Sequence, residues 1–333
     1  MIFHPAIIAL YVSSVLIGFI VLYSASYGIQ IIRRWDIKSG SELQLILERK
    51  TYLISTLLTY LFIFELLSLF LYIFTVDQLH TFFVGAMCAA GSLYVNDYGY
   101  PALILKIINF LLAGLWLILN YTDNQAYDYP LIIKKYSLLL ILTPLIFTEM
   151  ILQANYFLRL KPDIITSCCG TLFSTDPGSL ASEIHLLPGV PMTVIFYLSM
   201  VFTIASGIYY YLKGTGGYLF SSLTAITFLS SILSIISFIS VYFYELPTHH
   251  CPFCILQKEY GYVGYPLYLT LFGGTILGTG VGLLMPFKKI KSLSEIIPSV
   301  QRKLALVSLI LFLIFTAIVT YKVVFSGLIL EGK

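Results

Sequence analysis

Residues 245–262, ELPTHHCPFCILQKEYGY, contain the densest group of reactive side chains in the sequence. Cys251 and Cys254 are separated by two residues, and His249 and His250 directly precede them. This cysteine spacing is used by structural zinc sites, covalent haem attachment sites and redox dithiols. Haem attachment needs a histidine directly after the second cysteine, and an isoleucine stands there. The sequence therefore leaves zinc binding and redox chemistry as alternatives.

Zinc and redox chemistry place different demands on the residues around the pair. A structural zinc ion needs four ligands. The two histidines and two cysteines would supply them only if neighbours on one short segment turned toward a single tetrahedral centre. A redox dithiol needs a low thiolate pKa, which a helix N-terminus provides through its dipole and free N–H groups. We expect a hydrophobic helix to begin just after the pair, with Pro252 in its first turn, which favours the redox dithiol.

The composition defines the class of protein. Hydrophobic residues make up 59% of the 333 residues and charged residues 11%, a balance that a soluble core of ordinary proportions cannot accommodate. Apolar stretches of about 20 residues, long enough to cross a hydrocarbon core of ~30 Å, occur at about 5–31, 51–75, 101–120, 137–157, 189–212, 218–244, 263–285 and 304–325. We therefore predict an all-α polytopic membrane protein, a bundle of about eight transmembrane helices. The first span lacks a preceding Lys or Arg and exceeds a signal-peptide core, so we interpret it as a retained helix.

The cations predict the orientation in the membrane, because Lys and Arg concentrate in short cytoplasmic loops. Thirteen of the 19 Lys and Arg residues fall in the loops after the first, third, fifth and seventh spans: Arg33, Arg34, Lys38, Arg49, Lys50, Lys134, Lys135, Lys213, Lys288, Lys289, Lys291, Arg302 and Lys303. The opposite loops contain only Arg159, Lys161 and Lys258. We therefore expect both termini on the extracytoplasmic side of the cell inner membrane.

All five cysteines fall in segments that this orientation places outside. The segments are 76–100 with Cys88, 158–188 with Cys168 and Cys169, and 245–262 with Cys251 and Cys254. Cysteines used only as small core residues would scatter through the spans. Disulfides form and persist in the oxidising compartment outside the membrane, so this distribution favours thiol chemistry.

The adjacent cysteines Cys168 and Cys169 have three alternative interpretations. Their thiols could exchange with Cys251 and Cys254 through a mixed disulfide, they could bind a soft metal ion, or they could form a strained vicinal disulfide with a structural role. Cys88, the fifth cysteine, is a small packing residue in the simplest interpretation. A free thiol and an intermolecular bond are the alternatives for Cys88.

The stretch Cys251-Pro-Phe-Cys254-Ile-Leu-Gln257-Lys258 resembles the C-x-x-C-(I/L/W)-x-(Q/E)-R stretch of the DsbB/BdbC membrane thiol oxidases. The resemblance implies that electrons pass from a periplasmic thioredoxin-fold protein through the dithiol to a membrane quinone, with Gln257 and Lys258 near the quinone. Lys258 stands where the family has an arginine, and it supplies the charge without the planar fork. The order of loop cysteines first and membrane pair later is more similar to vitamin K epoxide reductase-like proteins.

Three ionisable residues interrupt the predicted spans. Glu65 lies deep in the second span, and Lys106 and Glu149 lie near the ends of the third and fourth. Ionisable groups inside a membrane are candidate functional sites. A proton path or a hydrogen bond to a buried quinone would use Glu65, and a neutral carboxyl group bonded to a neighbouring helix is the structural alternative.

Together these patterns predict two halves, residues 1–157 with spans one to four and residues 158–333 with the outer loop and spans five to eight. The leading hypothesis is a membrane thiol–disulfide oxidoreductase. It would exchange electrons between an extracytoplasmic thioredoxin-fold or cytochrome-assembly protein and a quinone in the lipid bilayer. One alternative is a membrane subunit of a respiratory or cytochrome assembly. The other is a non-enzymatic protein that binds or passes a soft metal ion through Cys168, Cys169, Cys251, Cys254, His249 and His250. No pattern typical of nucleic-acid binding is present.

Overall fold

The computed structural model of the protein describes residues 4–161, 164–166 and 189–328. In this part of the chain the regular elements are helices, and the one β contact is an isolated bridge between Val84 and Ile165. Eight of the described helices are long and apolar enough to cross a bilayer. The predicted all-α polytopic bundle is confirmed, and the protein is a multi-pass membrane protein. The side on which its termini lie stays a prediction.

Each predicted span is a helix. The first four are α1 (Pro5–Arg34), α2 (Glu42–Gln78) with its 3-10 extension η1 (Leu79–Phe82), α4 (Gly99–Asp123) and α5 (Ile132–Leu158), and the short α3 (Ala89–Leu93) precedes α4. The last four are α7 (Gly189–Lys213), α8 (Gly217–Ser234) with its continuation α9 (Ser240–Tyr244), α10 (Gly264–Leu284) and α11 (Ile296–Phe325). Several helices exceed the predicted spans, because the apolar pattern marks only the part that crosses hydrocarbon, whereas helical hydrogen bonding continues into polar flanks.

The chain forms two compact units. Unit 1 consists of Met1–Thr75, Asn96–Leu160 and Pro286–Val300, and unit 2 consists of Val76–Val95, Lys161–Met285 and Gln301–Lys333. Most of unit 1 is the predicted half 1–157, but the segment with Cys88 belongs to unit 2. Cys88 is therefore in the same unit as the cysteines of loop 245–262.

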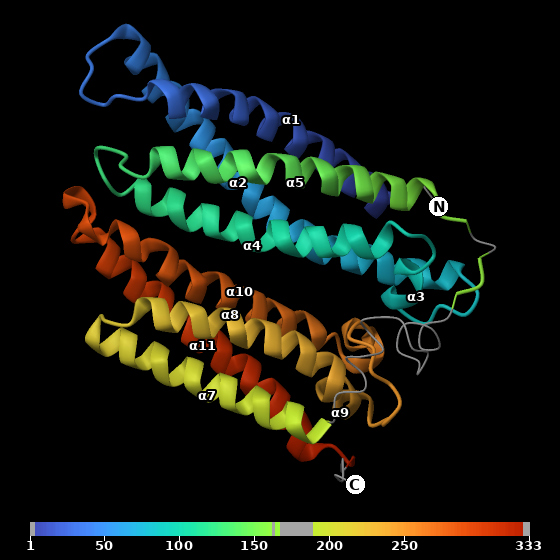
Figure 1. The fold of residues 1–333 in the computed structure, drawn as a ribbon. Coiled ribbons are helices and arrows are strands. Elements are labelled where there is room, and N and C mark those ends of the chain that lie inside the picture. Colours follow the sequence, from blue (N-terminus) through green and yellow to red (C-terminus); the bar gives the residue numbers. More distant parts are fainter. Residues whose placement is uncertain (1–3, 162–163, 167–188, 329–333) are drawn as a thin grey trace. The chain divides into compact units, whose positions relative to one another are not determined.

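In unit 1, α5 packs against both α1 and α4 (Figure 1). Gly28 allows a close approach of α1 to α5, because a Cβ there would lie 3.1 Å from the Tyr136 ring. The apolar core includes Phe62 and Trp116, whose rings meet edge-on with centroids 4.9 Å apart. The Trp116 indole N–H donates to the carbonyl of Lys135. The prediction of Lys135 as a loop cation is wrong, because this residue is buried inside α5.

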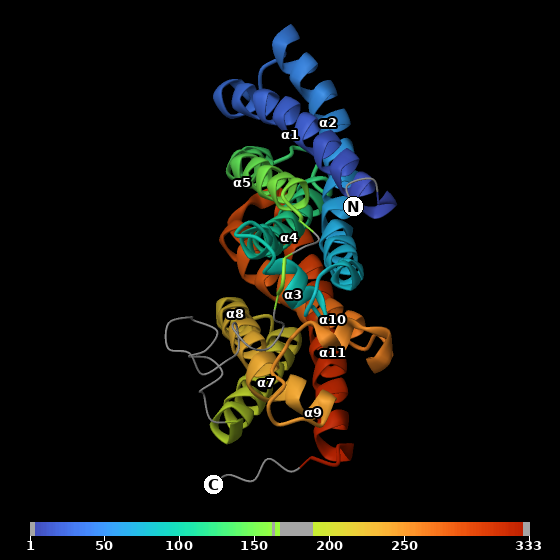
Figure 2. The same ribbon diagram turned by 90° about the vertical axis from the view of Figure 1, so that its right-hand side faces the viewer.

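In unit 2, α8 packs against both α7 and α10. Gly278 and Gly282 of α10 face Thr224 and Ser221 of α8 so closely that a Cβ at either glycine would clash. Small residues at a helix contact are common between transmembrane helices. At one end of unit 2, where α11 finishes, α3 and α9 lie together with residues 245–263 (Figures 1 and 2). The three described cysteines are at this end.

Candidate functional site: a buried thiol cluster

Three cysteine thiols meet at this end of unit 2. The Cys88 Sγ lies 3.4 Å from the Cys251 Sγ, although 163 residues separate them in the sequence. The Sγ atoms of Cys88, Cys251 and Cys254 all lie within 4.8 Å of one another. Each side chain is buried, and all three are thiols rather than disulfides. The structure thus joins the predicted pair to a cysteine that the sequence treated as a packing residue.

The helix that was predicted to begin just after the pair begins only at Gly264. Two single 3-10 turns come first, η3 (Cys254–Leu256) and η4 (Lys258–Tyr260). One 3-10 turn lacks the long row of aligned peptide dipoles that gives a helix N-terminus its positive potential. The prediction that a helix N-terminus activates the Cys251–Cys254 pair is therefore wrong, and the thiols must be activated by other groups.

Two tyrosines, the buried Tyr244 and the half-buried Tyr268, hold the backbone of the pair. The Tyr244 hydroxyl donates to the carbonyl of Cys251 and accepts the N–H of Ile255 at 2.9 Å. The Tyr268 hydroxyl donates to the carbonyl of Pro252 at 2.6 Å. These bonds satisfy backbone groups that a short irregular segment leaves without partners. They also fix the directions in which the two cysteine side chains leave the backbone.

His250 anchors the pair to a π-helical turn. The sixth span changes from α8 to the π turn η2 (Ile235–Ile239) before α9 begins. A π turn interrupts the regular helical hydrogen-bond ladder, and such turns are frequent at functional sites. The His250 Nδ1 lies 3.0 Å from the Ile236 carbonyl oxygen, which can only accept. Nδ1 therefore carries the proton and serves to position Cys251.

His249 is the ionisable side chain beside Cys254. Its Nε2 lies 3.3 Å from the Cys254 Sγ, and its ring packs edge-on against Tyr244 with centroids 4.5 Å apart. Burial lowers the pKa of His249, so the neutral imidazole is favoured at neutral pH. A neutral Nε2 can accept the proton of the Cys254 thiol.

The two cysteines of the pair differ in acidity. Hydrogen bonds from the thiols of Cys254 and then Cys88 lower the pKa of Cys251 well below its usual range. The hydrogen bond to Cys251, followed by that to Cys88, raises the pKa of Cys254, because a negative charge on one sulfur holds the proton on its neighbour. Cys251 is therefore the more acidic thiol of the pair.

A polar bridge holds the segment of Cys88 against the segment of the pair. The Gln257 side-chain amide donates to Asp77 Oδ1 at 3.3 Å and to the carbonyl of Met87 at 2.8 Å. The same Asp77 oxygen accepts the N–H of Ala89 at 3.0 Å. Asp77 and Gln257 thus connect the residues on both sides of Cys88 to the turn that follows Cys254. The sequence had singled out Gln257, but only through the resemblance.

Lys258 lies at the surface, in η4. In a continuous helix it would lie one turn from Cys254, since residues four apart share a face. The extended backbone of Gln257, with ψ 161°, separates the two turns instead. The contact of Lys258 with a quinone, which the resemblance implies, therefore stays a prediction.

Cys168 and Cys169 lie outside the described residues, but the chain just before them is described. The N–H of Thr166, two residues before Cys168, donates to the carbonyl of Val84 at 2.8 Å. Gly85 has a φ of 86°, and a Cβ there would collide with the Thr166 carbonyl oxygen. This close approach brings the start of the outer loop to the segment that leads into Cys88.

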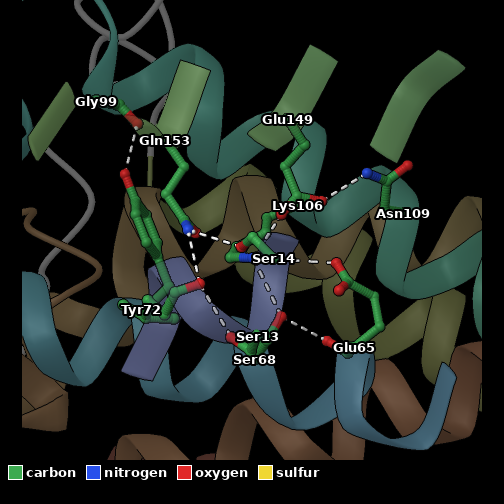
Figure 3. Close-up of polar contacts among 11 residues, drawn as sticks. Ser13, Ser14, Glu65, Ser68, Tyr72, Gly99, Lys106, Asn109, Glu149 and Gln153 are labelled. Carbon is green, nitrogen blue, oxygen red and sulfur yellow. Dashed lines mark hydrogen bonds and ion pairs between the residues drawn. The ribbon is translucent and has the colours of Figure 1, made fainter. Parts of the chain in front are cut away.

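Unit 1 has a polar site of its own, formed by the three ionisable residues that the sequence singled out. Glu65 from α2, Lys106 from α4 and Glu149 from α5 are buried together (Figure 3). The same unit buries a second ion pair, in which Lys135 Nζ lies 2.7 Å from Asp123 Oδ2. Both sites bury charge within or at the end of helices that are long and apolar enough to cross a membrane, where buried charge is expensive and commonly functional.

Comparison of the chain with known proteins gives no match to a family model, a curated protein or a solved structure. Function has to be argued from the chemistry and geometry of a site rather than from the fold that carries it. The thiol cluster carries the functional argument, because thiols at these distances have two specific chemistries, disulfide exchange and binding of soft metal ions.

Proposed function

We propose that the protein is a membrane thiol–disulfide oxidoreductase that exchanges electrons between an extracytoplasmic dithiol protein and a membrane quinone. The observation that carries the proposal is the 3.4 Å approach of the Cys88 Sγ to the Cys251 Sγ, beside Cys254. Sulfur atoms in contact can form a disulfide with small side-chain rotations. A cluster of three thiols can therefore pass a disulfide from one pair to another.

The oxidation of the partner consumes the Cys251–Cys254 disulfide. A thiolate of the partner dithiol attacks one sulfur of this disulfide and forms a mixed disulfide, which releases the other cysteine as a thiolate. The second thiolate of the partner then breaks the mixed disulfide. The partner leaves oxidised, and Cys251 and Cys254 are both reduced.

The quinone restores the disulfide. The two thiols give up two electrons and two protons, the quinone becomes a quinol, and the Cys251–Cys254 bond forms again. The same groups operate in reverse when a quinol supplies electrons for delivery outward. Cys251, as the more acidic thiol, loses its proton first and is the nucleophile of the reduced pair. His249 accepts the proton of Cys254 as that thiol reacts.

The side chains around the cluster suit a quinone head group. Partly buried aromatic rings of Phe253, Tyr260 and Tyr268 pack against the apolar cluster that contains the thiols. Aromatic faces can stack on a flat quinone ring, and a nearby cation can stabilise the negative charge that develops on its oxygen. The resemblance assigns the role of this cation to Lys258 and a second quinone contact to Gln257, although Lys258 is exposed to solvent in the absence of a quinone.

Cys168 and Cys169 are proposed as the thiols that meet the partner first. Thr166, which is tied to Val84, brings the start of their loop close to the Cys88 segment. A disulfide between Cys168 and Cys169 could then be exchanged with Cys88 or with the pair. The partner class, a soluble dithiol protein of the thioredoxin fold, comes from the resemblance.

The purified protein in detergent provides a direct test with a reduced thioredoxin-fold protein as donor and a short-chain ubiquinone as acceptor. We expect quinone reduction, measured by absorbance, to be lost in Cys251→Ser and in Cys254→Ser. Ser240→Ala, a buried change on α9, should leave the rate unchanged. Wild-type-like rates in both cysteine variants would refute the proposal, and so would failure of the wild-type protein to transfer electrons in either direction.

A second candidate is binding of a soft metal ion, which the convergence of three thiols also favours. Cys88, Cys251 and Cys254 offer three sulfur ligands, and the His249 Nε2 lies 3.3 Å from the Cys254 Sγ. Three sulfur ligands and one nitrogen ligand are a set typical of zinc and compatible with copper(I). This candidate predicts one metal ion per chain, measured by elemental analysis, that is lost in Cys88→Ser. It also predicts that the thiols stay reduced when the quinone is added.

A further inference from the structure

Three ionisable side chains meet inside unit 1, away from water (Figure 3). Glu65, Lys106 and Glu149 are each no more than 4% exposed. The Lys106 Nζ lies 2.5 Å from Glu149 Oε1 and 3.9 Å from Glu65 Oε1. Two carboxyl groups on different helices thus share one ammonium group.

The other polar side chains that contact this cluster among the described residues carry no charge at neutral pH. The Lys106 ammonium donates to Ser68 and lies over the Tyr72 ring, and Asn109 donates to Glu149 (Figure 3). With all three residues ionised, the cluster would therefore hold one uncompensated negative charge. An uncompensated charge in an apolar interior is strongly unfavourable, and a carboxyl group there takes up a proton instead.

The two carboxyl groups are not equivalent. Glu149 has a partner for each oxygen, because Lys106 binds Oε1 and the Asn109 amide donates to Oε2 at 2.6 Å. Glu65 Oε1 is buried and makes no hydrogen bond. The Lys106 ammonium is 3.9 Å from Glu65 Oε1, beyond hydrogen-bond distance, so this carboxyl group lacks the close partner that holds Glu149 ionised. The proton belongs on Glu65.

The other buried ion pair of unit 1 shows the contrast. Lys135 and Asp123 pair one to one at 2.7 Å, and the Lys135 ammonium also donates to Ser55 and Asn120. This pair is neutral as it stands and needs no proton. It therefore provides an internal control, with a similar environment and without the extra carboxyl group.

We infer that Glu65 is a proton-binding site within the membrane part of unit 1, and that Lys106 and Glu149 form the fixed ion pair beside it. Release of the proton from Glu65 to water leaves the cluster with a charge of minus one. Release is therefore coupled to a change that compensates this charge, such as entry of water between α2, α4 and α5. Proton binding and release at Glu65 do not depend on the thiol chemistry of unit 2.

Infrared spectroscopy of the purified protein tests this inference directly. We expect a carbonyl stretch of a buried protonated carboxylic acid that shifts to lower frequency in D2O and disappears at high pH. The band should be lost in Glu65→Gln, which has the same shape, and retained in Asp123→Asn. Loss of the band in Asp123→Asn, or its persistence in folded Glu65→Gln, would overturn the assignment. A band that never shifts in D2O would show a permanently held proton and would overturn the inference of exchange.

A hydrophobic carbodiimide gives an independent readout, because such reagents modify protonated carboxyl groups in apolar surroundings. Mass spectrometry should place the adduct on Glu65, with labelling lost as the pH rises. Labelling of Glu149 instead would show that Glu149, and not Glu65, carries the proton, and it would overturn the assignment. Protection by Na⁺ at constant pH and ionic strength would show that the cluster binds a metal cation, and would overturn the inference of a proton site.

Discussion

The two units bury different kinds of polar group. Unit 1 encloses the ionisable residues Glu65, Lys106, Asp123, Lys135 and Glu149, each paired with a group from another helix or turn. Among the described residues of unit 2, Asp77 is the one buried carboxylate, and the other buried polar side chains are hydroxyls, amides, thiols and His250. Asp77 accepts neutral hydrogen bonds from Gln257 and the Ala89 N–H. Buried ion pairs thus belong to unit 1 among the described residues, whereas unit 2 buries reactive but mainly neutral groups.

The difference follows from the cost of burial. An ionised side chain in an apolar interior requires a partner in a fixed position, and the pair holds two helices together. Removal of the partner therefore destabilises the protein. A thiol is nearly apolar until it loses its proton. A thiol can therefore be buried at little cost at a reaction site, where the neighbouring groups control its ionisation to the thiolate.

The largest expected effect is on the ion cluster of unit 1. Lys106→Met leaves two carboxyl groups without their cation, and breaking a buried pair in this way costs about 3–5 kcal/mol. We expect a correspondingly lower free energy of unfolding, measured by circular dichroism during denaturation in micelles. The control variant Lys134→Met, at an exposed lysine of the same unit, should be neutral. If Lys106→Met were equally neutral, buried charge would not be what stabilises unit 1.

An intermediate effect is expected where unit 2 depends on neutral hydrogen bonds. Tyr244→Phe removes the hydroxyl that serves both Cys251 and Ile255, and unpaired buried groups cost about 1–3 kcal/mol. The pair should become more mobile, so maleimide should label Cys251 and Cys254 faster than in the wild-type protein. Tyr242→Phe, which packs against the same cluster, is the matched control. Equal labelling rates in the two variants would show that the phenol does not hold the pair.

The sequence predicted what depends on local pattern and missed what depends on distant contacts. Apolar length found all eight spans, and the C-x-x-C spacing found Cys251 and Cys254. The approach of Cys88 across 163 residues had no local signal beyond its predicted location on the outer side. Tyr244 is one of 26 tyrosines, so nothing in the sequence distinguished it.

Two predictions from the sequence were wrong, the start of the helix after the Cys251–Cys254 pair and the loop position of Lys135. They have a common physical cause, because the hydrophobic pattern does not locate helix ends. The helix expected directly after the pair is delayed to Gly264, because Gly261 and Tyr262 take left-handed backbone conformations with φ of 65° and 56°. Lys135 was counted in a loop, whereas α5 begins at Ile132 and buries it beside Asp123. In both places the polar or glycine-containing flank of an apolar run decided the structure.

The smallest expected effect is that of the exposed cation Lys258 in unit 2. Exposed charge pairs contribute about 0.2–1 kcal/mol, so Lys258→Met should slow quinone-coupled turnover by no more than about fivefold, taking 1.36 kcal/mol as tenfold. The neighbouring exposed variant Glu259→Gln provides the control for a change of surface charge. A loss of about 100-fold, restored in Lys258→Arg, would mean that the ammonium reaches a quinone oxygen in the bound state, where a single electrostatic stabiliser has an effect of this size. That outcome would support the residue role implied by the resemblance, and it would break the contrast between the units, since a charge in unit 2 would then act away from bulk water.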